Sequence, residues 1–408
     1  MKKDYENLRE LGKRFSEIAA LPVQREKRAL WTSNNDLKPV RPLVLMDQLP
    51  WHEIAKNDEM SLRCEDDFLR SVEQSLREIL YRWAHFPCDL VVENRIDVPK
   101  TVRNLDYGIH IREEIRSNDP GNDIVSHKYE DQLRTTEALD ALREDKVEAD
   151  QALDLRHLDM LNEIFAGIAP VRLSGVQIHA GIWDRIAQMR PAEKILWDLV
   201  DDPDLIEATV KRFVQLTMST VDQCEKLGLL DPALQYVHCT GAYTSDLPGD
   251  GFTGEKASAK DCWAFGMAQL FATVSPAMHE EYEIEMVKPL YERFGLMYYG
   301  CCEPLHDRIH MVRKIKNVRK ISISPWANIE TAAENIGPDY VFSCKINPAF
   351  IANGFETADI VDQFSRALAA TRKNRTPAEF ILKDVSTVGN HLERLDKWGE
   401  LAMRMVEA

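Results

Sequence analysis

The chain has 408 residues, of which 44% are hydrophobic and 29% are charged; this composition is that of a folded globular protein and not of a disordered one. The formal net charge of −16 argues against a nucleic acid partner, because phosphate binding needs clustered Lys and Arg. No apolar run approaches the roughly 18 residues that span a bilayer, and the charged N-terminal residues contain no apolar signal-peptide core. We therefore expect a cytoplasmic protein that neither spans a membrane nor binds nucleic acid.

The first half of the chain predicts helices and a few short strands. Residues 3–19 and 62–84 carry apolar side chains at helical spacing. Between them, residues 41–47 form an apolar run that could be a strand, and residues 89–94 indicate the first strand of the main body. Residues 107–113 alternate enough to predict a strand within a polar insertion at about 105–165. We expect residues 1–85 to form an N-terminal helical extension.

From about residue 170, short apolar strands alternate with helices, which predicts a parallel sheet covered by helices. The expected helices are 277–294, 305–316, 329–336, 357–371 and 391–406, and the expected strands are 171–179, 235–239, 265–273, 296–301, 320–324 and 340–346. With strand 89–94, this count favours an α/β protein with a (β/α)8 TIM barrel over residues 86–408. No Gly-x-Gly-x-x-Gly follows the first strand, so the common dinucleotide motif is missing.

Polar residues gather at the ends of these predicted strands, where a parallel barrel places its active site. The strand ends carry Asn94, Gln177, His179, His238, Cys239, Cys301, Cys302, Glu303, Trp326 and Cys344. Zinc prefers thiolate, imidazole and carboxylate ligands. We therefore predict a zinc site formed by Cys301, Cys302, Cys344 and His238, with Glu303 as a further candidate ligand. The alternative is that these cysteines only fill the core, as buried cysteines often do.

The remaining site assignments follow from the same placement. We predict catalytic roles for Glu303, His238 and Asn94, and a substrate-binding role for Gln177 and His179. Residues 240–254 form a long Gly-rich loop, and loops of this length in compact domains are usually functional or mobile. Tyr243 and Trp326 could line an aromatic pocket beside this loop, or they could be ordinary packing residues.

Three segments carry a family resemblance: Val274-Ser-Pro276, Ile321-Ser-Ile-Ser-Pro-Trp326 and Gly337 to Pro348. They resemble the uroporphyrinogen decarboxylase superfamily, over roughly residues 170–375. The resemblance implies a (β/α)8 barrel. One branch of that superfamily decarboxylates uroporphyrinogen, and another uses zinc to move methyl groups to or from corrinoid proteins, as in the methylcobamide:coenzyme M methyltransferases.

The sequence differs from the motifs of both branches, and the differences favour the methyltransferase branch over the decarboxylase branch. The decarboxylase branch has an Arg-Gln-Ala-Gly-Arg type motif near its N-terminus, and here Leu43-Val-Leu-Met-Asp-Gln-Leu-Pro50 stands in that place. The methyltransferase branch has a His-x-Cys motif and a distant cysteine as zinc ligands. Here Tyr299-Gly-Cys301 replaces the motif, and Cys344 lies near the distant cysteine. His238, Cys302 or Glu303 could replace the missing histidine.

The resemblance thus implies a zinc-dependent methyltransferase. It would move a methyl group between a small methylated substrate (an aryl methyl ether, an amine or a thiol) and the cobalt of a methylcobamide or cobalamin on a partner corrinoid-binding protein. Two alternatives stay open. One is a decarboxylase that needs no metal, for which Arg95 and Arg185 could bind substrate carboxylates. The other is a corrinoid-binding or tetrapyrrole-binding protein without catalytic activity.

Overall fold

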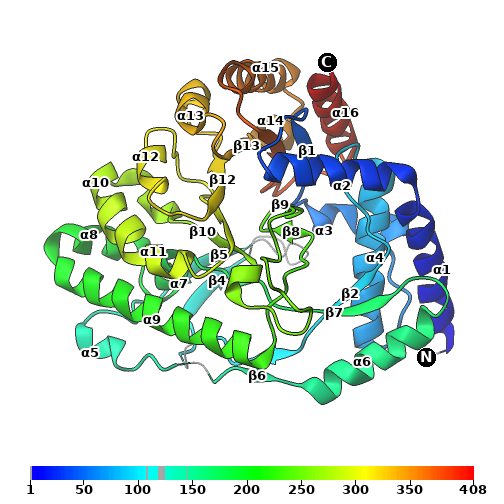
Figure 1. Cartoon of the computed structure of the whole chain (residues 1–408), viewed down its shortest axis with the longest axis horizontal. Helices are drawn as coiled ribbons and strands as arrows, with labels where there is room; N and C mark the ends of the chain where they lie inside the picture. Colours follow the sequence, from blue (N-terminus) through cyan, green and yellow to red (C-terminus); the bar gives the residue numbers. More distant parts are fainter. Residues whose placement is uncertain (1, 107–108, 118–124, 145) are drawn as a thin grey trace.

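The computed structural model describes residues 2–106, 109–117, 125–144 and 146–408 (Figure 1). The N-terminal segment is helical, as expected, and the helix α1 (Lys2–Ala19) packs on α4 (Asp67–His85). Both helices bury apolar residues at helical spacing, among them Leu8 and Leu76. Asp66 caps α4 by accepting a hydrogen bond from the amide of Leu69 at 3.0 Å. The other elements of this segment are α2 (Pro22–Asn35), β1 (Leu43–Met46), α3 (Trp51–Ile54) and a 3₁₀ turn η1 (Asp58–Met60).

The centre of the molecule is a sheet of six parallel strands in the order β1-β14-β13-β12-β11-β10. The protein is therefore of the mixed α/β class. Every residue of β13 and β14 is buried, as expected of parallel strands covered on both faces. The strands besides β1 are β10 (Trp263–Gly266), β11 (Leu296–Tyr299), β12 (Val318–Ile323), β13 (Val341–Ile346) and β14 (Ala378–Leu382).

A second parallel pair lies beside this sheet, formed by β2 (Ile96–Pro99) and β7 (Val171–Ser174). Two backbone hydrogen bonds link the chain near this pair to the six-stranded sheet: Asp89 N to Val44 O, and Ala180 N to Phe265 O. Because β1 pairs with β14 along its whole length, residues 1–85 contribute a strand to the same sheet as the C-terminal half. The division of the chain at residue 85 stays a prediction.

Helices cover the sheet, and α13 (Ile329–Ile336), α15 (Thr357–Asn374) and α16 (Glu393–Glu407) pack along one face (Figure 1). None of the helices in the described ranges is long and apolar enough to cross a lipid bilayer. The other helical elements of this half are α7 (Ile182–Met189), α8 (Ala192–Asp201), α9 (Pro203–Leu227), η2 (Ala259–Asp261), η3 (Gln269–Thr273), α10 (Pro276–His279), the π-helical η4 (Glu280–Glu285), α11 (Met286–Tyr291), α12 (Ile309–Val312) and α14 (Ala349–Ala352).

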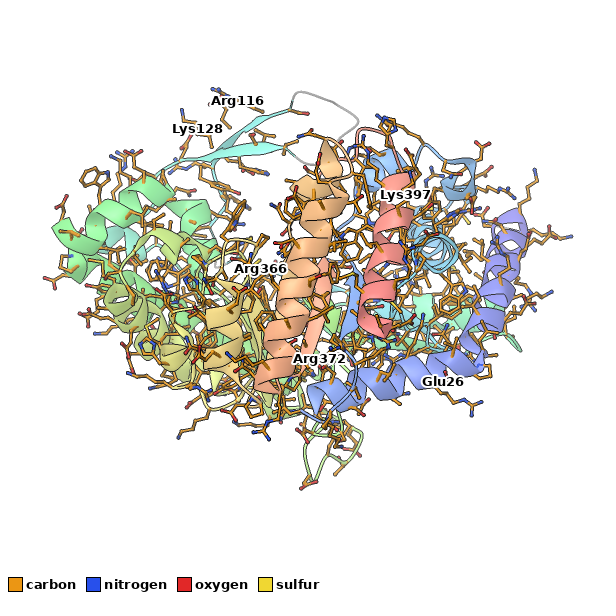
Figure 2. The ribbon with its side chains drawn as sticks, turned by 90° about the horizontal axis from the view of Figure 1, so that it is seen from above. Glu26, Arg116, Lys128, Arg366, Arg372 and Lys397 are labelled. Atoms are coloured by element: carbon orange, nitrogen blue, oxygen red, sulfur yellow. The ribbon has the colours of Figure 1, made fainter. Side chains whose placement is uncertain are left out.

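The insertion contains two short antiparallel pairs, and Arg116 and Lys128 mark an exposed hairpin that projects from the body of the molecule (Figure 2). This hairpin replaces the strand predicted at 107–113, of which residues 107 and 108 lie outside the described residues. The elements of the insertion are β3 (Val102–Arg103), β4 (Glu113–Arg116), β5 (Ser126–Tyr129), α5 (Thr136–Leu139), β6 (Glu148–Ala149) and α6 (Gln151–Ile164).

Several strand predictions differ from the structure. No strand forms at 89–94, and β2 begins instead at Ile96; the strand predicted at 171–179 ends at Ser174. The strand predicted at 235–239 is instead a small hairpin of β8 (Tyr236–Val237) and β9 (Thr240–Gly241). The apolar run 265–273 ends its strand at Gly266 and continues into the 3₁₀ turn η3, because a short buried run has no period that separates strand from helix. The strand β14 was not predicted, and it is the strand that pairs β1 with the rest of the sheet.

Candidate functional site

Four side chains meet at the carboxyl end of the six-stranded sheet. Lys383, directly after β14, places its Nζ 3.1 Å from His238 Nε2 and 3.2 Å from Cys301 Sγ. Cys301 Sγ lies 3.8 Å from His238 Nε2 and 3.7 Å from Cys302 Sγ. An ammonium group only donates hydrogen bonds, so His238 Nε2 accepts from Lys383 and the ring carries its proton on Nδ1. We call these four residues the thiol–lysine cluster.

Two unusual backbone conformations place the cluster. His238 lies in the turn between β8 and β9 with a φ of +53°, which is uncommon for a residue with a side chain. Its ring is stacked on Phe265 of β10, with centroids 3.9 Å apart. Gly300 turns the chain out of β11 with a φ of +91°, and a Cβ there would lie 2.5 Å from Leu305 Cδ1. Backbone strain of this kind often marks a functional site.

Glu303 and Gln177 hold the loops of the cluster in place. The carboxylate of Glu303 is fully buried and accepts hydrogen bonds from the amides of Ala268 at 3.1 Å and Cys301 at 3.0 Å. Gln177 accepts a hydrogen bond from the amide of His238 at 3.3 Å and donates one to the carbonyl of Tyr236 at 3.1 Å. Both residues were predicted at the site, and both contact the backbone of the cluster.

Cys344 does not join the other two thiols of the predicted zinc site. Its neighbours on β13, Ser343 and Lys345, contact the hydroxyl of Tyr298 on one face of the sheet. Side chains alternate along a strand, so Cys344 faces the opposite side, where it is 1% exposed. Burial raises the pKa of its thiol to about 12, as expected for a cysteine that fills the core.

Three other predicted residues lie apart from the cluster. Asn94 accepts a hydrogen bond from Ser16 of α1 at 3.3 Å. Tyr243 is held against α2 by a hydrogen bond from Asn35 to its carbonyl at 2.7 Å. Trp326 is 68% exposed and so does not line a closed pocket. Polarity and position at a strand end did not distinguish these residues from the members of the cluster.

His179 also contacts Phe265, in an edge-on arrangement with a centroid distance of 5.2 Å. It lines a cavity of about 370 Å³ together with Asp184 of α7. Burial, followed by the charge of Glu303, raises the pKa of Asp184 to about 6. Burial and then the neighbouring His238 lower the pKa of His179. Asp184 was not predicted, because it lies in a helix and not at a strand end.

The cluster as arranged does not fit a zinc ion. Cys301, Cys302 and His238 are suitable donors, and a catalytic zinc needs three protein ligands. However, the ammonium of Lys383 lies within hydrogen-bond distance of two of these donors, and Cys344 is on the far face of β13. In the part of the chain that the structure describes, no group of three or more His, Cys, Asp and Glu residues could hold a metal ion. Zinc therefore stays a prediction that these contacts do not support.

The pKa values of the two adjacent thiols are shifted in opposite directions. The pKa of Cys302 is lowered, chiefly by a hydrogen bond from the Cys301 thiol and with help from the charge of Lys383, against the effect of burial. The pKa of Cys301 is raised by the same hydrogen bond and by burial. Burial, the largest single effect, lowers the pKa of Lys383, but its interactions with Cys239 and Cys301 raise that pKa above its ordinary value. Cys302 is thus the more acidic thiol of the pair.

This difference predicts selective alkylation. Cys302 is exposed, whereas the other seven cysteines are buried, and only the thiolate reacts with iodoacetamide. At pH 7 we expect Cys302 to be modified at least tenfold faster than Cys301 or Cys344, as measured by peptide mass spectrometry. Cys302→Ser should remove the fast phase and Cys344→Ser should leave it unchanged. Equal modification of Cys301 and Cys302 would contradict the assignment.

Asp184 predicts a pH-dependent effect on stability. A carboxyl whose pKa is raised on folding binds more protons in the folded state than in the unfolded state, so its contribution to stability falls as the pH rises from about 4 to about 6. The difference in unfolding free energy between Asp184→Asn and the wild type should therefore favour the variant by about 1 kcal/mol more at pH 8 than at pH 5. Urea unfolding at both pH values measures this gain, and a gain that does not depend on pH would rule out the raised pKa.

The fold is shared with a known enzyme. A methyltransferase from Methanosarcina mazei superposes on the chain with a TM-score of 0.52, over 93% of this chain and 98% of that one, at 8% sequence identity. At this identity the likeness establishes a common fold and not a common activity. Comparison of the sequence with protein family profiles and with curated proteins gives no match.

Proposed function

We propose that this protein is a methyltransferase whose reaction centre is the thiol–lysine cluster. The observation that carries the proposal is the ammonium of Lys383, placed between an imidazole and a thiol at the carboxyl end of the sheet. In α/β proteins this is the edge at which ligands bind. The common fold with a methyltransferase over 93% of the chain supports the same conclusion.

Lys383 supplies the positive charge that the transfer of a methyl group needs. When a methyl group leaves an oxygen, nitrogen or sulfur atom, the electron pair of the broken bond stays on that atom. A fixed ammonium group stabilises the resulting negative charge or donates a proton to it. In the reverse direction, the same ammonium keeps a thiol acceptor in its reactive thiolate form. His238 and Cys301 hold Lys383 in place by accepting its hydrogen bonds.

The finer features of the proposal come from the family resemblance. The methyl group would pass between a small methylated ether, amine or thiol and the cobalt of a corrinoid carried by a partner protein. The six-stranded sheet and the β2–β7 pair would together form an irregular (β/α)8 barrel. The two backbone hydrogen bonds that link the pair to the sheet, Asp89 N to Val44 O and Ala180 N to Phe265 O, support this arrangement.

Methylation of free cob(I)alamin tests the proposal. The purified protein is mixed with cob(I)alamin and, in turn, with 4-methoxybenzoate, methylamine and dimethyl sulfide, and methylcobalamin formation is followed by absorbance. We expect at least one donor to be demethylated, and Cys344→Ser to retain this activity. Release of carbon dioxide without methyl transfer would favour the decarboxylase alternative, and tight corrinoid binding without turnover would favour a binding protein.

A metal measurement on the same samples tests the role of Lys383. Zinc that binds with one equivalent per chain and is lost in Cys301→Ser would assign the positive charge to a metal ion instead of the lysine. We expect the activity to survive dialysis against a chelator, because Lys383 already occupies the position between the donors.

A further inference from the structure

A cavity of about 320 Å³ lies between the N-terminal helices and the chain that leads into β2. This volume is in the range of pockets that hold a small organic molecule. Its walls are largely apolar and include the aromatic rings of Phe15, Phe68 and Tyr236. On the helical side, the cavity is lined by Phe15 of α1 and by Phe68, Val72, Leu76 and Ile79 of α4.

One cation faces these walls with an unused donor. Arg82 of α4 donates from Nη2 to the carbonyl of Met46 at 2.7 Å, and its distance to Asp47 Oδ1 is 3.9 Å. Its Nε has no hydrogen-bond partner among the described residues but is closed off from solvent, whereas Nη1 also has no partner there and belongs to the part of the side chain, 14% in all, that stays exposed. A ligand anion that accepts a hydrogen bond from Nη1 would form a charge-assisted bond, which is stronger than a bond between neutral groups.

The carboxylates of the cavity do not compete for Arg82. Glu93 is 2.9 Å from Arg95 and 3.3 Å from Arg28. Asp97 is 3.1 Å from Arg95 and 3.0 Å from Arg172. These ion pairs neutralise both carboxylates and also occupy Arg95, so Arg82 is the group in this cavity that an anionic ligand can reach with a free hydrogen bond.

The β8–β9 hairpin carries both a residue of the cavity and a residue of the thiol–lysine cluster. Tyr236 lines the cavity, and its ring lies 5.9 Å from the guanidinium of Arg82. Two residues later, His238 contacts Cys301 and Lys383. The side chain of Gln177 forms hydrogen bonds with the backbone of both Tyr236 and His238. These bonds hold the two residues of the hairpin relative to each other.

We propose that this cavity binds the body of the methylated substrate, and that the substrate is a small aromatic carboxylate. The apolar walls would enclose the ring, and Nη1 of Arg82 would donate a charge-assisted hydrogen bond to the carboxylate. This inference rests on the proposed function only in calling the ligand a methyl donor, and binding itself can be measured without corrinoid.

Calorimetric titration of the purified full-length protein tests the inference with three probes: 4-methoxybenzoate, benzoate and anisole. Both carboxylates should bind at least about tenfold more tightly than anisole, because anisole has no charged group that can accept a hydrogen bond from Arg82. Arg82→Met should abolish this preference. Equal affinity for anisole and 4-methoxybenzoate, or no binding of either carboxylate at 10 mM, would overturn the inference.

A second variant keeps the inference testable if Arg82→Met does not fold. Ser75 of α4 lines the cavity but is exposed, so Ser75→Trp should fill the opening without disturbing the core and should abolish the binding of both carboxylates. Gln74→Trp is the matched control, since Gln74 is the exposed neighbour of Ser75 and bonds to Glu78 instead. Carboxylate binding that survives Ser75→Trp would place the ligand elsewhere.

The outcomes separate this inference from the proposed function. If 4-methoxybenzoate binds in an Arg82-dependent manner but its methyl group does not reach cob(I)alamin, the cavity is a carboxylate site and the proposed reaction fails. If methylamine or dimethyl sulfide is demethylated while neither carboxylate binds, the reaction stands and the cavity assignment fails.

Discussion

Lys383→Met is expected to lower kcat for methyl transfer by about 10²–10³-fold, the effect of removing one fixed group that stabilises charge in a transition state. The side chain is 3% exposed and lies 3.1 Å from His238 Nε2 and 3.2 Å from Cys301 Sγ. Methionine keeps the length and apolar stem of lysine but carries no charge. Steady-state kinetics with the donor found active in the cobalamin assay measure the loss.

Two further variants make this prediction specific. Lys383→Arg keeps the positive charge and should retain part of the activity. Lys397→Met removes an exposed lysine on α16 (Figure 2) and should have no effect. The alkylation rate of Cys302 should also fall in Lys383→Met, because the charge of Lys383 helps to lower the pKa of that thiol. If Lys383→Met and Lys383→Arg retain equal activity, the charge has no role in the reaction.

The second large effect is expected from Lys320, which forms an ion pair in the core beneath the cluster. Its Nζ lies 2.8 Å from Glu379 Oε2, and both side chains are fully buried. It also donates to Thr240 Oγ1 and to the carbonyl of Gly241, each at 2.9 Å. The pair lowers the pKa of Glu379 although burial, the largest effect, would raise it. The pair therefore joins β12 and β14 to the β8–β9 hairpin that carries His238.

Removal of one partner leaves the other charge buried without compensation. We expect Lys320→Met to reduce the free energy of unfolding by about 3–5 kcal/mol, as measured by urea denaturation at pH 7. The double variant Lys320→Met, Glu379→Leu should recover much of this loss, because no unpaired charge then remains. A double variant as unstable as Lys320→Met would show that the carboxylate is not the cause.

Lys314→Met is the matched surface control for this prediction. Lys314 bonds to Glu285 at 2.7 Å, but its side chain is 44% exposed. An ion pair in contact with water contributes little to stability, because solvent and salt screen it. The loss in Lys314→Met should therefore be several times smaller than in Lys320→Met, and equal losses would argue against burial as the source of the effect.

The sequence by itself determined the elements whose patterns are long or strongly apolar. The helical spacing of residues 3–19 and 62–84 predicted α1 and α4, and the alternation after residue 170 predicted parallel strands between helices. From the rule that polar residues meet at the carboxyl ends of parallel strands, we predicted that His238, Cys301 and Cys302 lie close together, as the structure shows. The physical reason is that these signals are local: they depend on side-chain periodicity and on strand direction, which neighbouring residues establish.

The tertiary structure decided which of the predicted residues meet. Cys344 follows the same strand-end rule as Cys301, but the alternation of side chains along β13 turns it to the other face. Lys383 escaped prediction because β14 was not recognised, although the apolar run Phe380-Ile-Leu382 before Lys383 is a signal that could have found it. Contacts between strands distant in sequence depend on register and on which face each residue occupies, and one chain's local pattern contains neither.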